Sequence, residues 1–295
     1  PPGYARPRLT DMRRDEVVKV LMEDDAVRLV WSLDEDLWTS VSTDGKTFSA
    51  PRRIALPVSS GWSEQSCHVM TDESGRYLLT FVSDRDAQHR ELPYMSWSRD
   101  FQHWSAPLRI GPSRFYPGRI TPDDKGRFLY FHERRQSKVR VSRDGRHWHA
   151  PGRAYRFELG KRHARPPQLL QRADGTYLLA VLAVADLKDK QPPLFVLAGS
   201  SDLDRWRVID CVRLTGHGRE NPPPRAFKLV REGSTLFAVM FHQGPNERPY
   251  DQRTSVLRRD ADGRWSRSAV FHGVARTSAD VGHHPRWGTY MVWMS

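Results

Sequence analysis

The chain has 295 residues, 38% hydrophobic and 11% aromatic, a composition that supports a folded core and excludes a disordered chain. No apolar run approaches the roughly 18 residues that a membrane-spanning helix needs, so no membrane span is expected. The formal net charge of +12 favours an anionic partner: an acidic glycan, a membrane surface or a nucleic acid. Because the basic residues are scattered along the chain rather than grouped in blocks, a nucleic acid is not expected.

A short turn followed by an apolar run recurs along the chain at a spacing of roughly 50 residues. The segment before each copy is also rich in β-branched, aromatic and apolar residues, which predicts a series of β-hairpins. No stretch has sustained helical periodicity. The six copies lie at residues 24–31, 73–81, 124–131, 173–181, 232–241 and 285–294.

A second pattern follows the first four hairpins. It places Ser, then Asp two residues later, then an aromatic residue four positions further on, as in VSRDGRHW at 141–148. An Asp side chain can accept hydrogen bonds from the backbone N–H groups of its own turn, and a Ser hydroxyl can do so more weakly. The pattern therefore predicts structural turns, here called the Ser-x-Asp turns, whose aromatic residue packs between sheets. They begin at Ser42, Ser98, Ser142 and Ser200, and a degenerate fifth copy is expected at 258–265.

Each repeat unit therefore contains four strands, with the Ser-x-Asp turn between the third and the fourth. Four-stranded antiparallel units at this period are typical of β-propeller blades. Six hairpins predict one all-β domain over residues 1–295, a six-bladed β-propeller of four-stranded antiparallel blades. The sixth blade shows only its two inner strands before Ser295, so either residues 1–14 complete it or the chain is truncated.

The Ser-x-Asp turns resemble the Asp-box, or BNR repeat, of the sialidase-like superfamily, and the resemblance covers about residues 15–295. The boxes of that superfamily often have one more residue between Asp and the aromatic residue, and similar short forms occur in five-bladed glycosidase propellers. The resemblance implies a secreted or periplasmic carbohydrate-active propeller, with glycoside hydrolysis as the favoured activity. Because non-enzymatic propellers carry such boxes too, a non-catalytic glycan-binding or protein-interaction module of a larger secreted protein is the alternative.

The loops expected on the binding face of the propeller are rich in Arg, with acidic residues between. A guanidinium can bind a carboxylate or sulfate through two parallel hydrogen bonds, so converging Arg side chains would hold an anionic glycan. The alternative is that each Arg pairs with a nearby Asp or Glu at the surface. The candidate substrate-binding residues are Arg119, Arg165, Arg219, Arg276, His163 and Tyr116.

Glycoside hydrolysis would need two carboxylates, one as acid and one as base or nucleophile. The candidates are Glu220, Glu64 and Asp280, each at the start of an inner strand, and Asp86 in a long loop. The alternative for each is a hydrogen-bonded structural carboxylate. Sialidases also place a Tyr at the start of a late blade; the segment ARTSADVG has none, which puts strict sialidase activity in doubt.

No metal or cofactor is expected from the motifs. Cys67 and Cys211 are the two cysteines, no CxxC spacing is present, and no nucleotide-binding fingerprint appears in a supporting context. Two free, buried thiols are the expectation for this pair.

Overall fold

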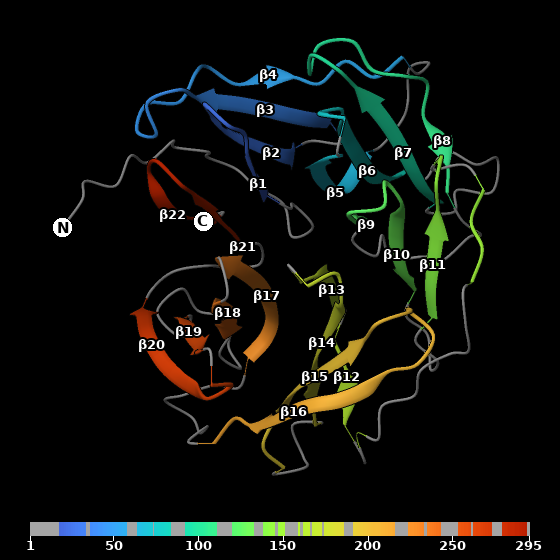
Figure 1. Cartoon of the computed structure of the whole chain (residues 1–295). Helices are drawn as coiled ribbons and strands as arrows, with labels where there is room; N and C mark the ends of the chain where they lie inside the picture. Colours follow the sequence, from blue (N-terminus) through green and yellow to red (C-terminus); the bar gives the residue numbers. More distant parts are fainter. Residues whose placement is uncertain are drawn as a thin grey trace. The chain divides into compact units, whose positions relative to one another are not determined.

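The computed structural model is all-β within its described residues, as the sequence predicts, and all its sheets are antiparallel (Figure 1). No helix in this part of the chain is long and apolar enough to cross a membrane. The described residues are 18–33, 36–57, 64–72, 74–83, 92–110, 120–132, 138–144, 147–150, 159, 162–165, 167–172, 174–185, 191–215, 224–232, 235–242, 253–260, 262–272 and 279–293.

The first of two compact units comprises Pro1–Pro117 and Thr277–Ser295. Its described residues form two four-stranded sheets, each with its strands in chain order, and one two-stranded sheet. The first sheet contains β1 (Val18–Met22), β2 (Val27–Leu33), β3 (Asp36–Ser42) and β4 (Arg52–Arg53); the second contains β5 (Glu64–Thr71), β6 (Tyr77–Ser83), β7 (Leu92–Ser98) and β8 (Leu108–Arg109); the hairpin contains β21 (Ala279–His284) and β22 (Gly288–Trp293).

The second unit, Gly118–Arg276, contains three sheets in its described residues. These are β9 (Ile120–Pro122), β10 (Phe128–His132) and β11 (Lys138–Ser142); β12 (His163–Ala164), β13 (Gln168–Gln171), β14 (Tyr177–Val184), β15 (Leu194–Ser200) and β16 (Arg207–Arg213); and β17 (Pro224–Glu232), β18 (Thr235–His242), β19 (Arg253–Arg259) and β20 (Trp265–His272).

The core of the second unit lies on both faces of β14, and every residue of this strand is buried. On one face, Leu179 packs in a cluster with Leu129 and Val141 of the preceding sheet. On the other, Leu182 packs in a cluster with Phe227 of the following sheet. A strand covered on both faces needs a continuous apolar run rather than an alternating one, which explains the sequence YLLAVLAV.

The prediction of six four-stranded blades is wrong, because the structure has five blades. Within the described residues their sheets contain four, four, three, five and four strands. The hairpin that was counted as a sixth blade, β21–β22, is a sheet of only two strands, and residues 1–14 lie outside the described residues. A turn followed by an apolar run predicts a hairpin, whereas a blade also needs two outer strands; counting hairpins therefore overestimates the number of blades.

The β21–β22 hairpin is attached instead to the sheet β1–β4. The buried His284 ring donates from Nε2 to the carbonyl oxygens of Glu23 and Asp24, at 3.0 and 3.1 Å. The Tyr290 hydroxyl donates to the carbonyl oxygen of Gly45 at 2.8 Å. These bonds join the hairpin to two turns of the first sheet, so side chains of the last strands contribute to the stability of the first.

The Ser-x-Asp turns have the predicted structure. In the second turn, Oδ1 of Asp100 accepts hydrogen bonds from the backbone N–H groups of Gln102 and His103, both at 2.8 Å, and from the Ser98 hydroxyl at 3.1 Å. The same three bonds occur around Asp44 and Asp202. The aromatic residues Trp104 and Trp206 are buried in the adjacent cores, which confirms their packing role.

The expected fifth copy at 258–265 is not a Ser-x-Asp turn. Arg258 stands where the other turns have Ser, and Gly263 has a φ of 82°. The Asp260 N–H donates to the Arg264 carbonyl at 3.0 Å, and the Gly263 N–H donates to the Asp260 carbonyl at 3.1 Å. The same bonds close the turns Asp72–Arg76 and Asp123–Arg127, so this segment belongs to a second turn type, Asp-x-x-Gly-Arg.

Candidate functional site

Most of the predicted site residues lie outside the described residues. These are Glu220, Asp86, Arg119, Arg219, Arg276 and Tyr116. Glu64 begins β5, at the start of an inner strand as expected, although its side chain is not among those described. Asp280, His163 and Arg165 are described, the first in one unit and the other two in the other.

Asp280 lies on β21 with 2% of its surface exposed. Its Oδ2 accepts a hydrogen bond from the backbone N–H of Val20 on β1 at 2.9 Å. The buried Cys67 thiol lies within electrostatic range of the buried Lys19 and of Asp280. Burial raises the pKa of the Cys67 thiol to about 12, with the Lys19 charge opposing the shift and Asp280 adding to it. One oxygen of this predicted catalytic carboxylate therefore holds β21 against β1.

His163 and Arg165 flank Ala164 at the short strand β12, which precedes the inner strand β13. His163 is exposed, and the backbone N–H of Arg165 continues the pairing with β14 by donating to the Leu182 carbonyl at 2.7 Å. Because side chains alternate along an extended chain, His163 and Arg165 share one face of it. These two candidates therefore lie two positions apart at the start of the inner region of this sheet, and their role in binding stays a prediction.

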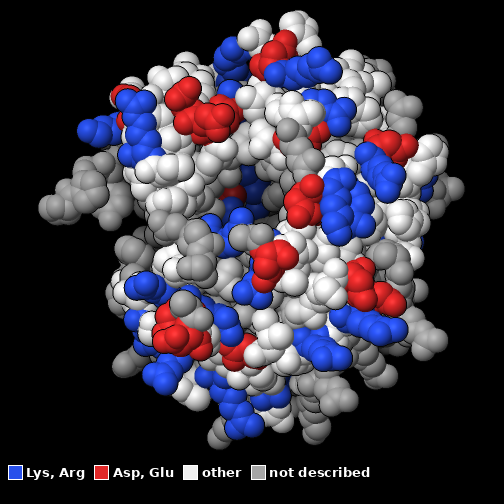
Figure 2. All heavy atoms as spheres, viewed as in Figure 1, with Lys and Arg blue, Asp and Glu red and all other residues white. Residues whose placement is uncertain are grey.

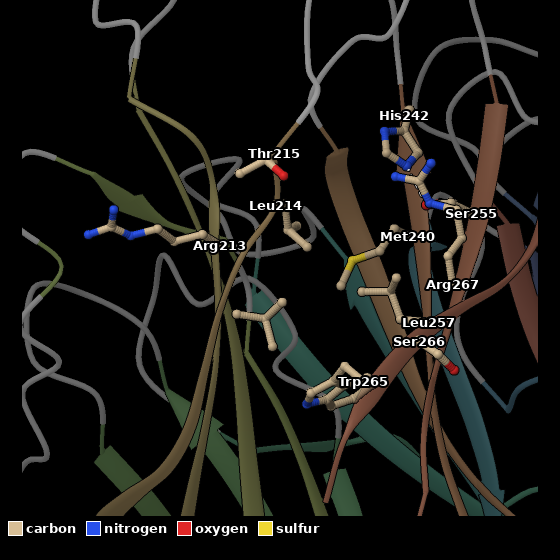
Figure 3. Close-up of a pocket in the computed structure, with 11 residues that line it drawn as sticks. Arg213, Leu214, Thr215, Met240, His242, Ser255, Leu257, Trp265, Ser266 and Arg267 are labelled. Atoms are coloured by element: carbon tan, nitrogen blue, oxygen red, sulfur yellow. Dashed lines mark hydrogen bonds between the residues drawn. The ribbon is translucent and has the colours of Figure 1, made fainter.

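A cavity of about 170 Å³ lies in the second unit, between the end of β16 and the strands β18, β19 and β20 (Figure 3). A cavity needs only about 10–15 Å³ to hold one water molecule, so this one has room for a small organic ligand. Its lining residues are Val212, Arg213, Leu214, Thr215, Met240, His242, Ser255, Leu257, Trp265, Ser266 and Arg267.

One end of the cavity is polar and cationic. The buried His242 ring is 2.7 Å from the Ser255 hydroxyl, measured from Nε2 to Oγ, and the Arg267 side chain points toward His242 (Figure 3). Arg253 pairs with His242 across the β18–β19 ladder and lies on the same strand face as Ser255. Burial lowers the pKa of the Arg253 guanidinium, and the nearby charge of Arg267 lowers it further.

The other end of the cavity is apolar and held in place. The indole Nε1 of Trp265 donates to Oδ2 of Asp210 at 2.7 Å, and the ring meets Phe195 edge to face, with 5.4 Å between centroids. Met240 and Leu257 line the same space. Two independent contacts therefore fix the orientation of the Trp265 ring before any ligand is present.

The sequence did not identify this cavity. His242 and Arg253 are the two ends of the segment HQGPNERPYDQR, 242–253, one of the Arg-rich loops expected on the binding face, and this position is the signal that the sequence offers. Trp265 lies at the other end of the cavity, because β20 pairs with β19 so that Trp265 is opposite Arg259, with a bulge between Val256 and Leu257. Which side chains of β16 face them depends on the packing of two sheets, which no local pattern reveals.

Several described arginines form ion pairs with acidic side chains. Arg28 lies 2.7 Å from Glu23, and Arg259 lies 3.2 Å from Asp210. In Figure 2, acidic side chains lie among the basic ones on the face in view. Arg253 and Arg267 are among the arginines that take part in none of the ion pairs between described residues.

The thiols and metal-ligand groups add no further site. Cys67 is buried, as expected, but Cys211 is exposed because β16 is the outer strand of its sheet; neither forms a disulfide. Within the part of the chain that the structure describes, no group of His, Cys, Asp and Glu side chains is arranged to hold a metal ion.

No protein-family model matches the chain, and no curated protein matches it in sequence. Solved structures do match. A Trypanosoma rangeli sialidase in complex with 2,3-difluorosialic acid is 14% identical, with a TM-score of 0.64 over 94% of this chain and 51% of that one. A thermostable family-43 glycoside hydrolase is 14% identical, with a TM-score of 0.57 over 87% and 93%.

A protein of unknown function from Dyadobacter fermentans is also similar, with 13% identity and a TM-score of 0.61 over 94% of this chain and 96% of that one. At these identities the likeness shows the fold alone. The chain has a β-propeller fold similar to that of the sialidase and of the family-43 glycoside hydrolase, as the Ser-x-Asp turns led us to expect.

Proposed function

We propose that this protein is a carbohydrate-active propeller, a glycoside hydrolase that acts on an anionic glycan. The observation that carries the proposal is the likeness of nearly the whole chain to two carbohydrate enzymes, a sialidase and a family-43 glycoside hydrolase. The anionic substrate is supported by the net charge of +12. The four Ser-x-Asp turns are proposed to be Asp-boxes, in a single domain that is secreted or periplasmic.

The proposed catalytic residues are the carboxylates of Glu220, Glu64, Asp86 and Asp280. Two carboxyl groups about 5–5.5 Å apart would give a retaining reaction through a covalent intermediate, and about 6.5–9.5 Å would give inversion by a water molecule. The anionic group of the substrate would be held by Arg119, Arg165, Arg219 and Arg276, with His163 and Tyr116 beside them. The shared face of His163 and Arg165 at β12 supports this arrangement.

Release of reducing sugar from a panel of acidic polysaccharides and chromogenic glycosides tests the proposal. The protein should hydrolyse at least one of them, and Glu220→Gln should lose about 10²–10⁴-fold in rate, the usual contribution of a general acid or base. Arg258→Met is the matched control, because Arg258 is exposed on β19 and should leave the rate unchanged. A folded protein that hydrolyses nothing in the panel would remove the hydrolase assignment.

A non-catalytic glycan-binding or protein-interaction module is the second candidate. Asp280 favours it, because that carboxylate is buried and one of its oxygens is bonded to the backbone of β1. Binding of a polysaccharide from the same panel without any release of sugar would support this candidate over the hydrolase.

A further inference from the structure

Among the described residues, no acidic side chain pairs with Arg267, which lines the cationic end of the cavity between β16 and β18–β20, or with Arg253, which lies next to that end on β19. Nε of Arg253 is buried and has no hydrogen-bond partner within the described residues. Arg267 approaches the same end and lowers the pKa of Arg253, which is further evidence that the two positive charges are close. Arg213 does not contribute, because its guanidinium points away from the other lining residues (Figure 3).

Buried polar groups in folded proteins nearly always have partners, and an exception requires an explanation. Placing two guanidinium groups near each other costs free energy through repulsion and through the desolvation of the buried group. An anion bound between them would relieve both costs. A carboxylate fits this role well, because its two oxygens match the planar fork of a guanidinium.

The opposite end of the cavity presents an apolar surface to the rest of such a ligand. The Trp265 ring is fixed by Asp210 and Phe195, and the Met240 and Leu257 side chains extend the apolar surface. The face of a sugar ring carries C–H groups that pack well against an indole, while its hydroxyls need partners of their own. Ser255, Thr215 and Ser266 supply hydroxyl groups in the lining.

We propose that this cavity is a binding site for a single acidic sugar residue, with the carboxylate on Arg267, the guanidinium that lines the cavity, and the ring extending from there toward Trp265. The proposed site uses none of the proposed catalytic carboxylates, and binding there does not require catalysis. It would hold one unit of an anionic glycan in addition to the unit at which hydrolysis is proposed.

The test is an NMR titration that follows the Trp indole N–H signals, with the Trp265 signal assigned by its loss in Trp265→Phe. Glucuronate should shift the Trp265 signal saturably, and glucose, which has the same ring without the carboxylate, should not. Arg267→Met should raise the dissociation constant for glucuronate at least tenfold, because it removes a charge-assisted pair of hydrogen bonds. Arg267 is exposed, so the variant should fold normally.

Arg258→Met is again the matched control, since it removes the same charge from the opposite face of β19. It should bind glucuronate as tightly as the unmodified protein. A Trp265 signal unmoved by glucuronate, equal shifts with glucose, or unchanged affinity in Arg267→Met would overturn the site. The hydrolysis panel is read separately: binding at Trp265 without any hydrolysis would contradict only the proposed activity.

Discussion

Charged side chains have hydrogen-bond partners in the Ser-x-Asp turns but lack them at the cavity beside β18 and β19, within the described residues. In each of the turns at Asp44, Asp100 and Asp202, one carboxylate oxygen accepts three hydrogen bonds within its own turn, although the residue is at the surface. Next to the cavity, the buried Nε of Arg253 has no hydrogen-bond partner within the described residues.

The difference separates groups that hold the fold from groups that are available to a ligand. A carboxylate that already accepts several hydrogen bonds within the protein contributes to stability and has little capacity left to bind a ligand. A buried cation without a partner lowers the stability of the folded protein, and binding of an anion raises that stability again. Substitutions in the two regions should therefore differ in sign as well as in size.

The largest loss in the free energy of unfolding is expected at a fully buried carboxylate that accepts several hydrogen bonds. Asp123 accepts hydrogen bonds from the backbone and guanidinium of Arg127 and from the Tyr177 hydroxyl. Its side chain is 0% exposed, so Asp123→Asn leaves Arg127 without its charge partner. We expect a loss of about 2–4 kcal/mol in the free energy of unfolding, measured by urea denaturation.

Asp260→Asn is the matched control, because Asp260 opens the same turn type but, among the described residues, its carboxylate accepts a hydrogen bond only from the backbone N–H of Arg264. It should cost less than about 1 kcal/mol. Equal losses in the two variants would contradict the view that burial and the number of accepted hydrogen bonds determine how much a turn carboxylate contributes to the free energy of unfolding.

Gly45 in the first Ser-x-Asp turn gives the next largest effect. Its φ is 72°, and a Cβ would lie 2.8 Å from Cγ of Trp287. Gly45→Ala should therefore add steric overlap to the strain of positive φ, at a total cost of about 2–3 kcal/mol. Gly75→Ala is the control, with a φ of 74° and nothing within 4 Å, and should cost about 1 kcal/mol. A difference near zero between their unfolding free energies would mean that the β21–β22 hairpin does not pack on this turn.

Arg253→Met should change stability little, or raise it by up to about 1 kcal/mol, because it replaces a partly buried guanidinium by an apolar chain. Thermal unfolding in the absence of ligand checks this. A loss of more than about 1 kcal/mol would show that Arg253 is a structural residue, and the contrast between cavity and turns would disappear.

The smallest effect is expected in the acid range. Hydrogen bonds from the His103 side chain and from the backbone N–H groups of His103 and Gln102 lower the pKa of Asp100. A carboxylate with a lowered pKa contributes stability above its unfolded pKa of about 3.9, and this contribution is lost as the pH falls through the folded pKa. Asp100→Asn should therefore lower Tm at pH 7 and flatten its decline below about pH 4. The exposed Asp262→Asn should leave the profile unchanged, and a parallel decline in all three proteins would contradict the assignment.

The turns could be predicted from the sequence because their chemistry is local. Asp100 accepts hydrogen bonds from residues only two and three positions away, so the residue types and their spacing determine the turn. The hairpins could be predicted for the same reason, but the number of blades could not, since β21 and β22 have the pattern of two inner strands without the outer pair.

The cavity depends instead on residues that are far apart in the chain. Asp210 and Trp265 are 55 positions apart, and their contact requires two sheets to pack in a particular register. The strand-start candidates were identified from topology, which places Glu64 and Asp280 on inner strands but does not show that Asp280 would bond to Val20.

The most direct measurement of the contrast is Tm and glucuronate affinity determined together for Arg267→Met and Asp202→Asn. We expect Arg267→Met to lose at least tenfold in affinity with Tm unchanged, and Asp202→Asn to lower Tm and to bind glucuronate as tightly as the unmodified protein. Loss of affinity in Asp202→Asn, or full affinity in Arg267→Met, would contradict this expectation.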